Sequence, residues 1–459
     1  MRMAKKMMER VLVVPALLLC CSACTVGPDY VRPDVPMPAA YGEASGTPEP
    51  MGSSVATDGS WWQRYGDAQL DTLVRQLDLH NQSLKAAAAR VDQADALLRA
   101  AGGTRVPSVT AGTVTSGISG RKDFGAQVVW ELDLWGRMRR DVEARGADAA
   151  AAADDLAAAT LSMRAQVVAS YFALRAKDAG IELLQAATTV NGRWLQIVRN
   201  RHALGVASSG ELAQAHLQLA DAQGQLASTR LERTQIEHAI ATLVGKPPAD
   251  FSIAPSPLPL DTKVPVIPAH LPSRLLERRP DIAAAERRVA SASARIGVRQ
   301  AEMLPSLDLG AGIGVLRGAF GAADLAAPLY RGGTLEAGVS GARASYAEAL
   351  AQYRQTVLDG FREVEDNLAA QRLLRSQTGI HEDAAKVAGD ALRISANQYK
   401  AGVADYELVV QARAELVKSH AAAVELLRRR LTTSVNLIKA LGGGWEMPAP
   451  TRSAGGARR

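Results

Sequence analysis

The chain has 459 residues, of which 47% are hydrophobic and only 4% aromatic, and 53 basic and 47 acidic side chains leave a net charge of +6. The low aromatic content argues against a thick globular core, and the small, dispersed charge argues against a nucleic-acid-binding surface. All three cysteines lie within the first 24 residues. No disulfide or thiolate metal site is therefore expected in the body of the protein.

Residues 1–23 are predicted to be a lipoprotein signal peptide. Basic residues precede an apolar run over 11–19, which is too short to span a membrane as a helix. The run ends in Cys-Ser-Ala-Cys at 21–24, which resembles the lipobox of bacterial lipoproteins, although its first position is usually aliphatic. We expect cleavage to leave Cys24 as a lipid-modified, palmitate-bearing N-terminus; an ordinary cleavable signal is the alternative.

The next segment, residues 24–60, is rich in Pro, Gly and Ser and is typical of an extended linker between the lipid anchor and the body. From Trp61 to Leu98 apolar residues recur at close to 3.5-residue spacing, which predicts helix. Gly102 and Gly103 are expected to end it.

The pattern changes at residues 107–133 and again at 305–330, where a β-hairpin is predicted in each case. In the first hairpin, one face of the second strand is apolar and carries Phe124, Ala126, Val128, Trp130 and Leu132. Such alternation has the period of a strand. Polar residues at 119–123 and a segment near 317–321 are the expected tips.

Very long helices are predicted after each hairpin, because no proline occurs from 108 to 246 or from 329 to 447. A helix from Gly136 to about Arg201 would contain roughly 65 residues and extend roughly 100 Å, which favours coiled-coil or helical-barrel packing over a globular core. Gly205 and Gly402 are the predicted helix reversals.

The same order of signals occurs twice, about 197 positions apart, and indicates an internal tandem repeat. Repeat 1 covers 61–246, a Pro-rich linker covers 247–271, repeat 2 covers 272–445, and a basic tail covers 446–459. Each repeat supplies two strands, whereas a closed barrel needs about eight or more. If the strands enter lipid, several chains must therefore combine, because every backbone polar group has to be satisfied there.

Three motifs carry a resemblance to a known family. They are Gly-Pro-Asp-Tyr at 27–30 followed by Arg-Pro at 32–33, Leu-Pro-Ser-Arg-Leu-Leu-Glu-Arg-Arg-Pro-Asp at 271–281, and Lys-Ala-Leu-Gly-Gly-Gly-Trp at 439–445. With them the chain resembles the TolC-like outer-membrane efflux proteins, in particular the OprM/NodT-type lipoprotein branch. The resemblance covers nearly the whole mature chain.

The resemblance implies an α+β membrane protein, a homotrimer in which four strands per protomer form one 12-stranded β-barrel that continues into a long α-helical coiled-coil barrel across the periplasm. It further implies an exit duct in the outer membrane that passively conducts drugs or other small solutes. The implied partners are a periplasmic adaptor (membrane fusion) protein, an inner-membrane RND-type transporter and outer-membrane lipid. An exit duct for protein secretion, or a lipid-anchored helical scaffold without an open pore, are the alternatives.

An enzyme is not expected, and neither is a cofactor or a metal. The seven histidines are scattered, and the pair His381-Glu382 lacks the second histidine of a zinc-protease motif because Ala385 stands there.

In the family, side chains near the helix reversals close the periplasmic end of the tunnel, often with an aspartate where this chain has Gln411. The aperture candidates are therefore Glu407, Gln411 and Asp405, with Glu211 as the matching acidic residue of repeat 1. Glu407 and Gln411 are four apart and would share a helix face, so three copies of Glu407 could form a ring that responds to pH and cations. Alternatively, Glu407 is a solvated residue of the outer face. Gly205 and Gly402 are expected to shape the adaptor-docking tip.

Overall fold

The computed structural model describes residues 25–36, 38–44, 60–115, 122–265, 267, 278–314 and 318–445. The predicted signal peptide 1–23, Cys24, the motif portion 271–277 and the tail 446–459 lie outside the described residues. The described chain forms two compact units. The sheet unit comprises residues 25–36, 86–157 and 280–359, and the helical unit comprises the other described residues.

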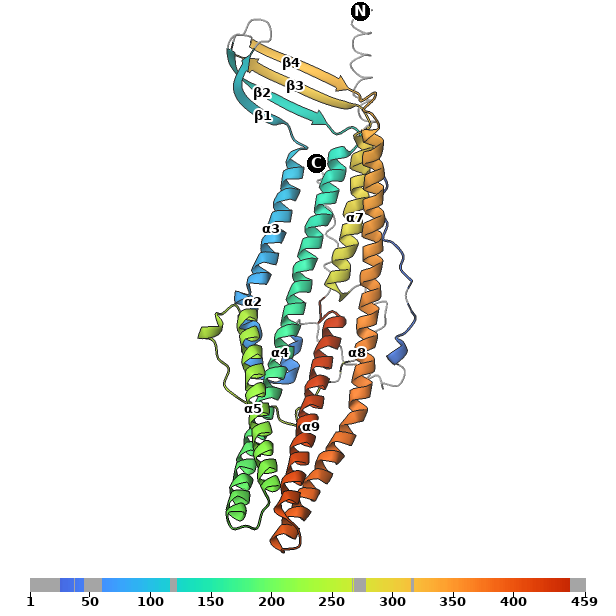
Figure 1. The fold of residues 1–459 in the computed structure, drawn as a ribbon. Helices are drawn as coiled ribbons and strands as arrows, with labels where there is room; N and C mark the ends of the chain where they lie inside the picture. Colours follow the sequence, from blue (N-terminus) through green and yellow to red (C-terminus); the bar gives the residue numbers. More distant parts are fainter. Residues whose placement is uncertain are drawn as a thin grey trace, which may run out of the picture. The chain divides into compact units, whose positions relative to one another are not determined.

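The sheet unit holds four strands, β1 (Ser108–Thr115), β2 (Lys122–Leu132), β3 (Ser306–Gly314) and β4 (Gly318–Ala326). They form a single antiparallel sheet in the order β1-β2-β3-β4 (Figure 1). The central pairing joins the two repeats, since Ala126 of β2 lies opposite Ile313 of β3. Both hairpins lie within the ranges expected from the alternating pattern.

Six of the described helices form three equivalent pairs. Helices α3 (Gln82–Gly103) and α7 (Pro280–Ala301) have 22 residues each, α4 (Arg137–Ala203) and α8 (Thr334–Lys400) have 67, and α5 (Ser209–Leu243) and α9 (Tyr406–Ala440) have 35. The members of a pair begin 198, 197 and 197 positions apart, as the bounds show. The tandem repeat predicted from the sequence is therefore confirmed.

The stretch from Trp61 to Leu98 forms three elements, although the periodicity predicted one continuous helix. A 3-10 helix η2 (Trp61–Tyr65) and helix α2 (Ala68–His80) precede α3. The break falls at the buried Asn81, whose backbone is extended with ψ 122°. Its side-chain Nδ2 donates to the carbonyl of Leu243 at 2.7 Å, and its Oδ1 accepts from the Leu84 amide at 2.9 Å. The bond to Leu84 caps the start of α3, and the long-range bond to Leu243 holds Asn81 at the break.

The glycines at the C-terminal end of repeat 2 are required for steric reasons. Gly442, Gly443 and Gly444 all have positive φ, a backbone region that glycine enters at little cost. A Cβ at Gly442 would overlap the carbonyl of Arg278, and a Cβ at Gly443 would overlap Leu161. This close approach inside the helical unit explains the glycine run that ends the family motif.

The start of the Pro-rich linker after α5, which includes the short 3-10 helix η3 (Pro248–Asp250), is fixed to the long helices of the helical unit. Arg233 of α5 donates from Nε to buried Asp178 of α4 at 2.8 Å and from a terminal nitrogen to the Ile253 carbonyl at 2.6 Å. Asp178 also accepts from the Ser256 amide at 2.9 Å.

None of the helices in the described part of the chain combines the length and the apolar character that crossing a membrane requires.

Candidate functional site

The two helix reversals of the helical unit have the same backbone geometry. Gly205 joins α4 to α5 with φ 72°, and Gly402 joins α8 to α9 with φ 71°. In each turn the residue after the glycine donates its amide to a carbonyl five positions back, Val206 to Arg201 and Val403 to Gln398, both at 2.9 Å. These are helix C-caps in which glycine takes the left-handed position. Both glycines therefore occupy the reversals that the sequence predicted.

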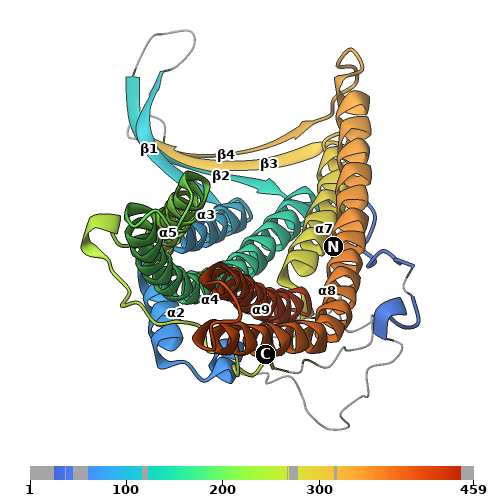
Figure 2. The same cartoon turned by 60° about the horizontal axis from the view of Figure 1, so that its bottom comes forward.

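The turns themselves present apolar side chains to solvent in the single chain. Leu204 and Val206 in the first turn are 79% and 64% exposed, and Val403 in the second is 78% exposed. Figure 2 shows the two helix pairs, α4 with α5 and α8 with α9, that end in these turns.

Three of the aperture candidates lie together at the start of α9. Asp405 is its N-cap, and Glu407 lies in its first turn. Glu407 and Gln411 are both exposed, and Gln411 Nε2 donates to Glu407 Oε1 at 3.0 Å. The two side chains therefore share one helix face as their spacing predicted.

Glu211 does not occupy the position equivalent to Glu407, contrary to the sequence prediction. Since α5 begins at Ser209 and α9 at Tyr406, the counterpart of Glu211 is Leu408. One residue rotates a helix by about 100°, so Glu211 faces a different direction. It closes a capping box instead: its carboxylate accepts from the Ser208 amide at 2.6 Å, and its own amide donates to Ser208 Oγ at 3.1 Å.

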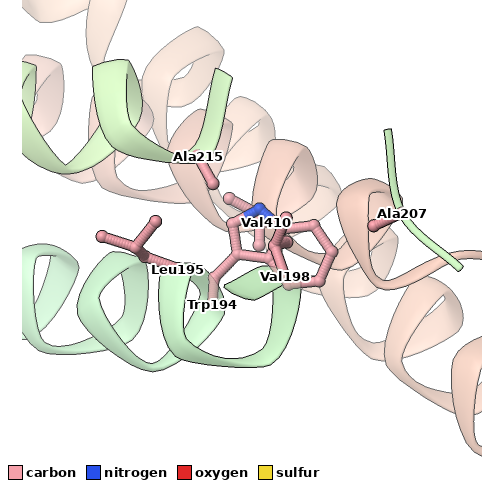
Figure 3. Packing of buried hydrophobic residues seen from close by; sticks show 6 residues of the cluster. All are labelled: Trp194, Leu195, Val198, Ala207, Ala215 and Val410. Carbon is pink, nitrogen blue, oxygen red and sulfur yellow. The ribbon is translucent and has the colours of Figure 1, made fainter. Parts of the chain in front are cut away.

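An aromatic contact beside the aperture candidates was not predicted from the sequence. Trp194 of α4 packs on Tyr406 of α9 with ring centroids 4.8 Å apart, and Tyr399 of α8 lies 4.9 Å from Tyr406. Tyr406 packs against a buried cluster that contains Trp194, Leu195, Val198, Ala207, Ala215 and Val410. Figure 3 shows these six cluster residues. The cluster, which we call the tip cluster, joins the first helix pair to α9. The only sequence signal for it is the helical spacing of these apolar residues.

A groove with a volume of about 770 Å³ runs between the α4–α5 pair and α9, within the helical unit. Its lining is mixed, with apolar residues such as Leu184 and Val417 and charged residues such as Lys177, Asp221 and Arg413. Gln411 and Val410 also line it, so the tip cluster forms part of its wall. Among the described residues no group of three or more His, Cys, Asp or Glu is arranged to hold a metal ion.

The chain is duplicated, contributes two hairpins to one antiparallel sheet, and contains two pairs of long helices that end in glycine reversals. Together these features define the class of outer-membrane efflux channels. The sequence model of the family described as "Outer membrane efflux protein" matches residues 73–246 and 271–443, one segment in each repeat. The chain belongs to this family, which is one of channel and transport proteins.

Individual relatives agree with this assignment. The chain is 30% identical over 452 residues to the pyoverdine export outer membrane protein OpmQ of Pseudomonas aeruginosa, a match that covers 88% of this chain and 95% of OpmQ. The solved structure of the outer-membrane channel OprN has a TM-score of 0.81 at 27% identity and covers 92% of this chain and all of that one. The open state of the MtrE outer membrane channel of Neisseria gonorrhoeae has a TM-score of 0.80 at 26% identity, with 92% and 99% covered.

Proposed function

We propose that the protein is the outer-membrane exit duct of a tripartite efflux pump, through which small solutes leave the cell passively. The observation that carries this proposal is the family match in both repeats, together with similarity to outer-membrane channels over nearly the whole chain. The protein acts at the cell outer membrane. We assign it no catalytic step.

We further propose that three protomers combine their sheets into one 12-stranded barrel. Within the described residues, the outer strands β1 and β4 each have a neighbour on one side only. Backbone groups that lack a partner are costly in lipid, so such edges must be paired by another copy. Each protomer supplies four strands, and a closed barrel needs eight or more. A small ring of protomers is therefore the simplest way to close the barrel.

Strand length supports a membrane-spanning role. The four strands have 8, 11, 9 and 9 residues, and a tilted strand needs about 9–11 residues to cross the hydrocarbon core. Exposed apolar residues on the hairpins, such as Val109, Phe124 and Leu325, are 61–70% accessible in the single chain. They are the side chains that lipid would cover.

The remaining parts of the proposal follow from the family. Cys24 carries the lipid anchor, a periplasmic adaptor docks on the tips around Gly205 and Gly402, and an RND-type transporter of the inner membrane supplies the solute. Glu407, Gln411 and Asp405 form the aperture of the periplasmic end, because Glu407 and Gln411 are exposed together on α9. The exposed Leu204, Val206 and Val403 suit a docking surface.

Single-channel conductance in a planar bilayer, with native mass measured on the same detergent-extracted sample, tests the function. The expected result is a trimer that produces discrete conductance steps with a preference for cations. A stable assembly that never conducts, even after residues around Gly402 are deleted to open the tip, would support the scaffold alternative and overturn the exit duct.

A further inference from the structure

A stripe of apolar side chains on α8 is exposed in the single chain. Its members recur every seven residues and are 49–68% exposed: Leu373, Ile380, Val387 and Ile394. Heptad spacing keeps apolar side chains along one seam of a helix, where a partner helix packs. The stripe, which we call the α8 stripe, therefore calls for a helix that does not cover it within the described residues of one chain.

The tandem repeat indicates which helix belongs there. Subtracting the offset of 197 residues places the stripe on α4, at positions that are all buried or half-buried: Ala176, Leu183, Val190 and Ile197. On that side α4 faces α9, since Leu183 and Val417 line one groove and Ile197 packs against the tip cluster, which includes Val410. A repeat that cannot cover its apolar face alone uses the equivalent part of its neighbour. The same offset converts α9 into α5.

Helix α5 has an exposed face that suits this role. Three valines of α9 line the groove beside α4 at seven-residue spacing: Val410, Val417 and Val424. Their counterparts on α5 are all exposed alanines, Ala213, Ala220 and Ala227. Small side chains opposite large ones let two helices interdigitate. Since both the alanine face and the α8 stripe are exposed in the chain, α5 does not cover its own α8.

Near the helix reversals, the repeat offset replaces the large residues of the tip cluster by small ones. Trp194, Val198 and Val410 lie together in this cluster (Figure 3), and Tyr406 packs on it. The counterparts of these four residues are Ala391, Ser395, Ala213 and Ser209. Because large apolar and aromatic side chains supply most of the packing energy of a contact, an α8–α5 seam would be weaker here than the α4–α9 seam.

We propose that α5 of a second copy of the chain packs on the α8 stripe in the register that α9 takes on α4, and that the proposed aperture opens by parting of this seam between copies. The two surfaces differ, so the contact is head-to-tail and repeats from copy to copy until a ring closes. Within each chain the tip cluster keeps α9 against the first helix pair. This inference rests on the proposed assembly of several copies and on the proposed aperture.

Cysteine cross-linking tests the register. Cys24 is the only cysteine outside the predicted signal segment, so Cys24→Ala, exported with a signal peptide that needs no lipidation, gives a cysteine-free background. The contact of Trp194 with Tyr406 predicts that Ala391 lies beside Ser209 of the next copy. We expect Ala391→Cys with Ser209→Cys, treated with a short bis-maleimide after assembly, to give covalent dimers and trimers on a denaturing gel.

The matched control is Ala391→Cys with Gln214→Cys. Gln214 is also exposed on α5, but it lies five positions further on and therefore about 140° around the helix. It should give several-fold less covalent product.

Single-channel records of the same preparations test the opening. Linking Ala391→Cys to Ser209→Cys between copies should shorten the open time several-fold. A link within one chain, from Leu183→Cys to Val417→Cys across the groove, should leave the open time unchanged, because the α4–α9 seam does not part.

Native mass measured before cross-linking separates the outcomes. A multimer in which Ala391→Cys with Ser209→Cys gives no more product than the control overturns the register and leaves the proposed assembly intact. Covalent trimers with an unchanged open time overturn the opening at this seam. A protein that stays monomeric overturns the proposed assembly, and this inference with it.

Discussion

Glu407 is the residue on which the proposed aperture depends most directly. Its carboxylate is exposed in the protomer and accepts a hydrogen bond from Gln411. Three copies near a common axis would attract cations by simple electrostatics. We expect Glu407→Gln to lower the cation-over-anion permeability ratio several-fold in reversal-potential measurements, while Glu407→Asp keeps the charge and most of the selectivity. Equal ratios in all three proteins would place Glu407 on the outer face.

Asp154 of α4 makes the free energy of unfolding depend on pH. Burial raises the pKa of its carboxyl from 3.8 to about 6, a shift that nearby Asp155 and Glu286 add to and Arg287 opposes. Because the folded-state pKa exceeds the unfolded value, the group stabilises the fold below about pH 4, and this contribution is lost as the pH rises through 6.

The corresponding substitution is Asp154→Asn, which removes the buried charge. At pH 7.5 we expect it to raise the free energy of unfolding by about 3 kcal/mol, visible as a higher Tm, and most of the difference from wild type should be lost near pH 4. Asp155→Asn should have a smaller effect with the same pH dependence, since Asp155 is exposed and only adds to the shift at Asp154. A Tm difference that does not vary with pH would contradict the assignment.

At the scale of elements, the tip cluster couples α9 to the first helix pair. Trp194→Ala removes the ring that packs on Tyr406 and leaves a cavity, which costs about 3–5 kcal/mol for a buried Trp. Because Glu407 directly follows Tyr406, we expect the start of α9 to loosen and the channel to spend more time open in single-channel records.

Trp194→Phe retains an aromatic ring at this position and should recover most of the closed time. If Trp194→Ala folds normally but opens no more often than wild type, the tip cluster only stabilises the helix packing.

Sequence alone could predict the hairpins, the long helices and the repeat. The spacing of apolar residues and the length of the proline-free stretches are local signals. Asn81 shows where such signals end: the break in the helix depends on a hydrogen bond to Leu243, 162 positions away. Glu211 was misplaced by one position because it was matched to Glu407 by charge, although the 197-residue offset between Gly205 and Gly402 assigns Leu408 to it. The contact of Trp194 with Tyr406 is equally long-range, so no local pattern identifies it.

At the scale of the whole molecule, the proposal gives the channel two attachments to the outer membrane, the proposed lipid on Cys24 and the proposed combined sheet. The sheet should therefore suffice once it has assembled. We expect Cys24→Ala, exported with a signal peptide that needs no lipidation, to abolish acyl labelling yet leave trimers in the outer-membrane fraction at half the wild-type amount or more. Complete loss of the protein from that fraction, with export intact, would instead favour the lipid-anchored scaffold.

The two helix reversals differ in one respect that bears on how the halves of a duplicated chain diverge. Ser208 and Glu211 cap α5 reciprocally, whereas Asp405, the N-cap of α9, makes no side-chain capping bond within the described residues. A capping bond contributes about 1 kcal/mol, so the amide of Ser208, which donates to Glu211, should exchange with deuterium more slowly than the amide of Asp405. The start of α5 is therefore held by its own capping bonds, whereas the start of α9 is held by the packing of Tyr406 against Trp194 and Tyr399.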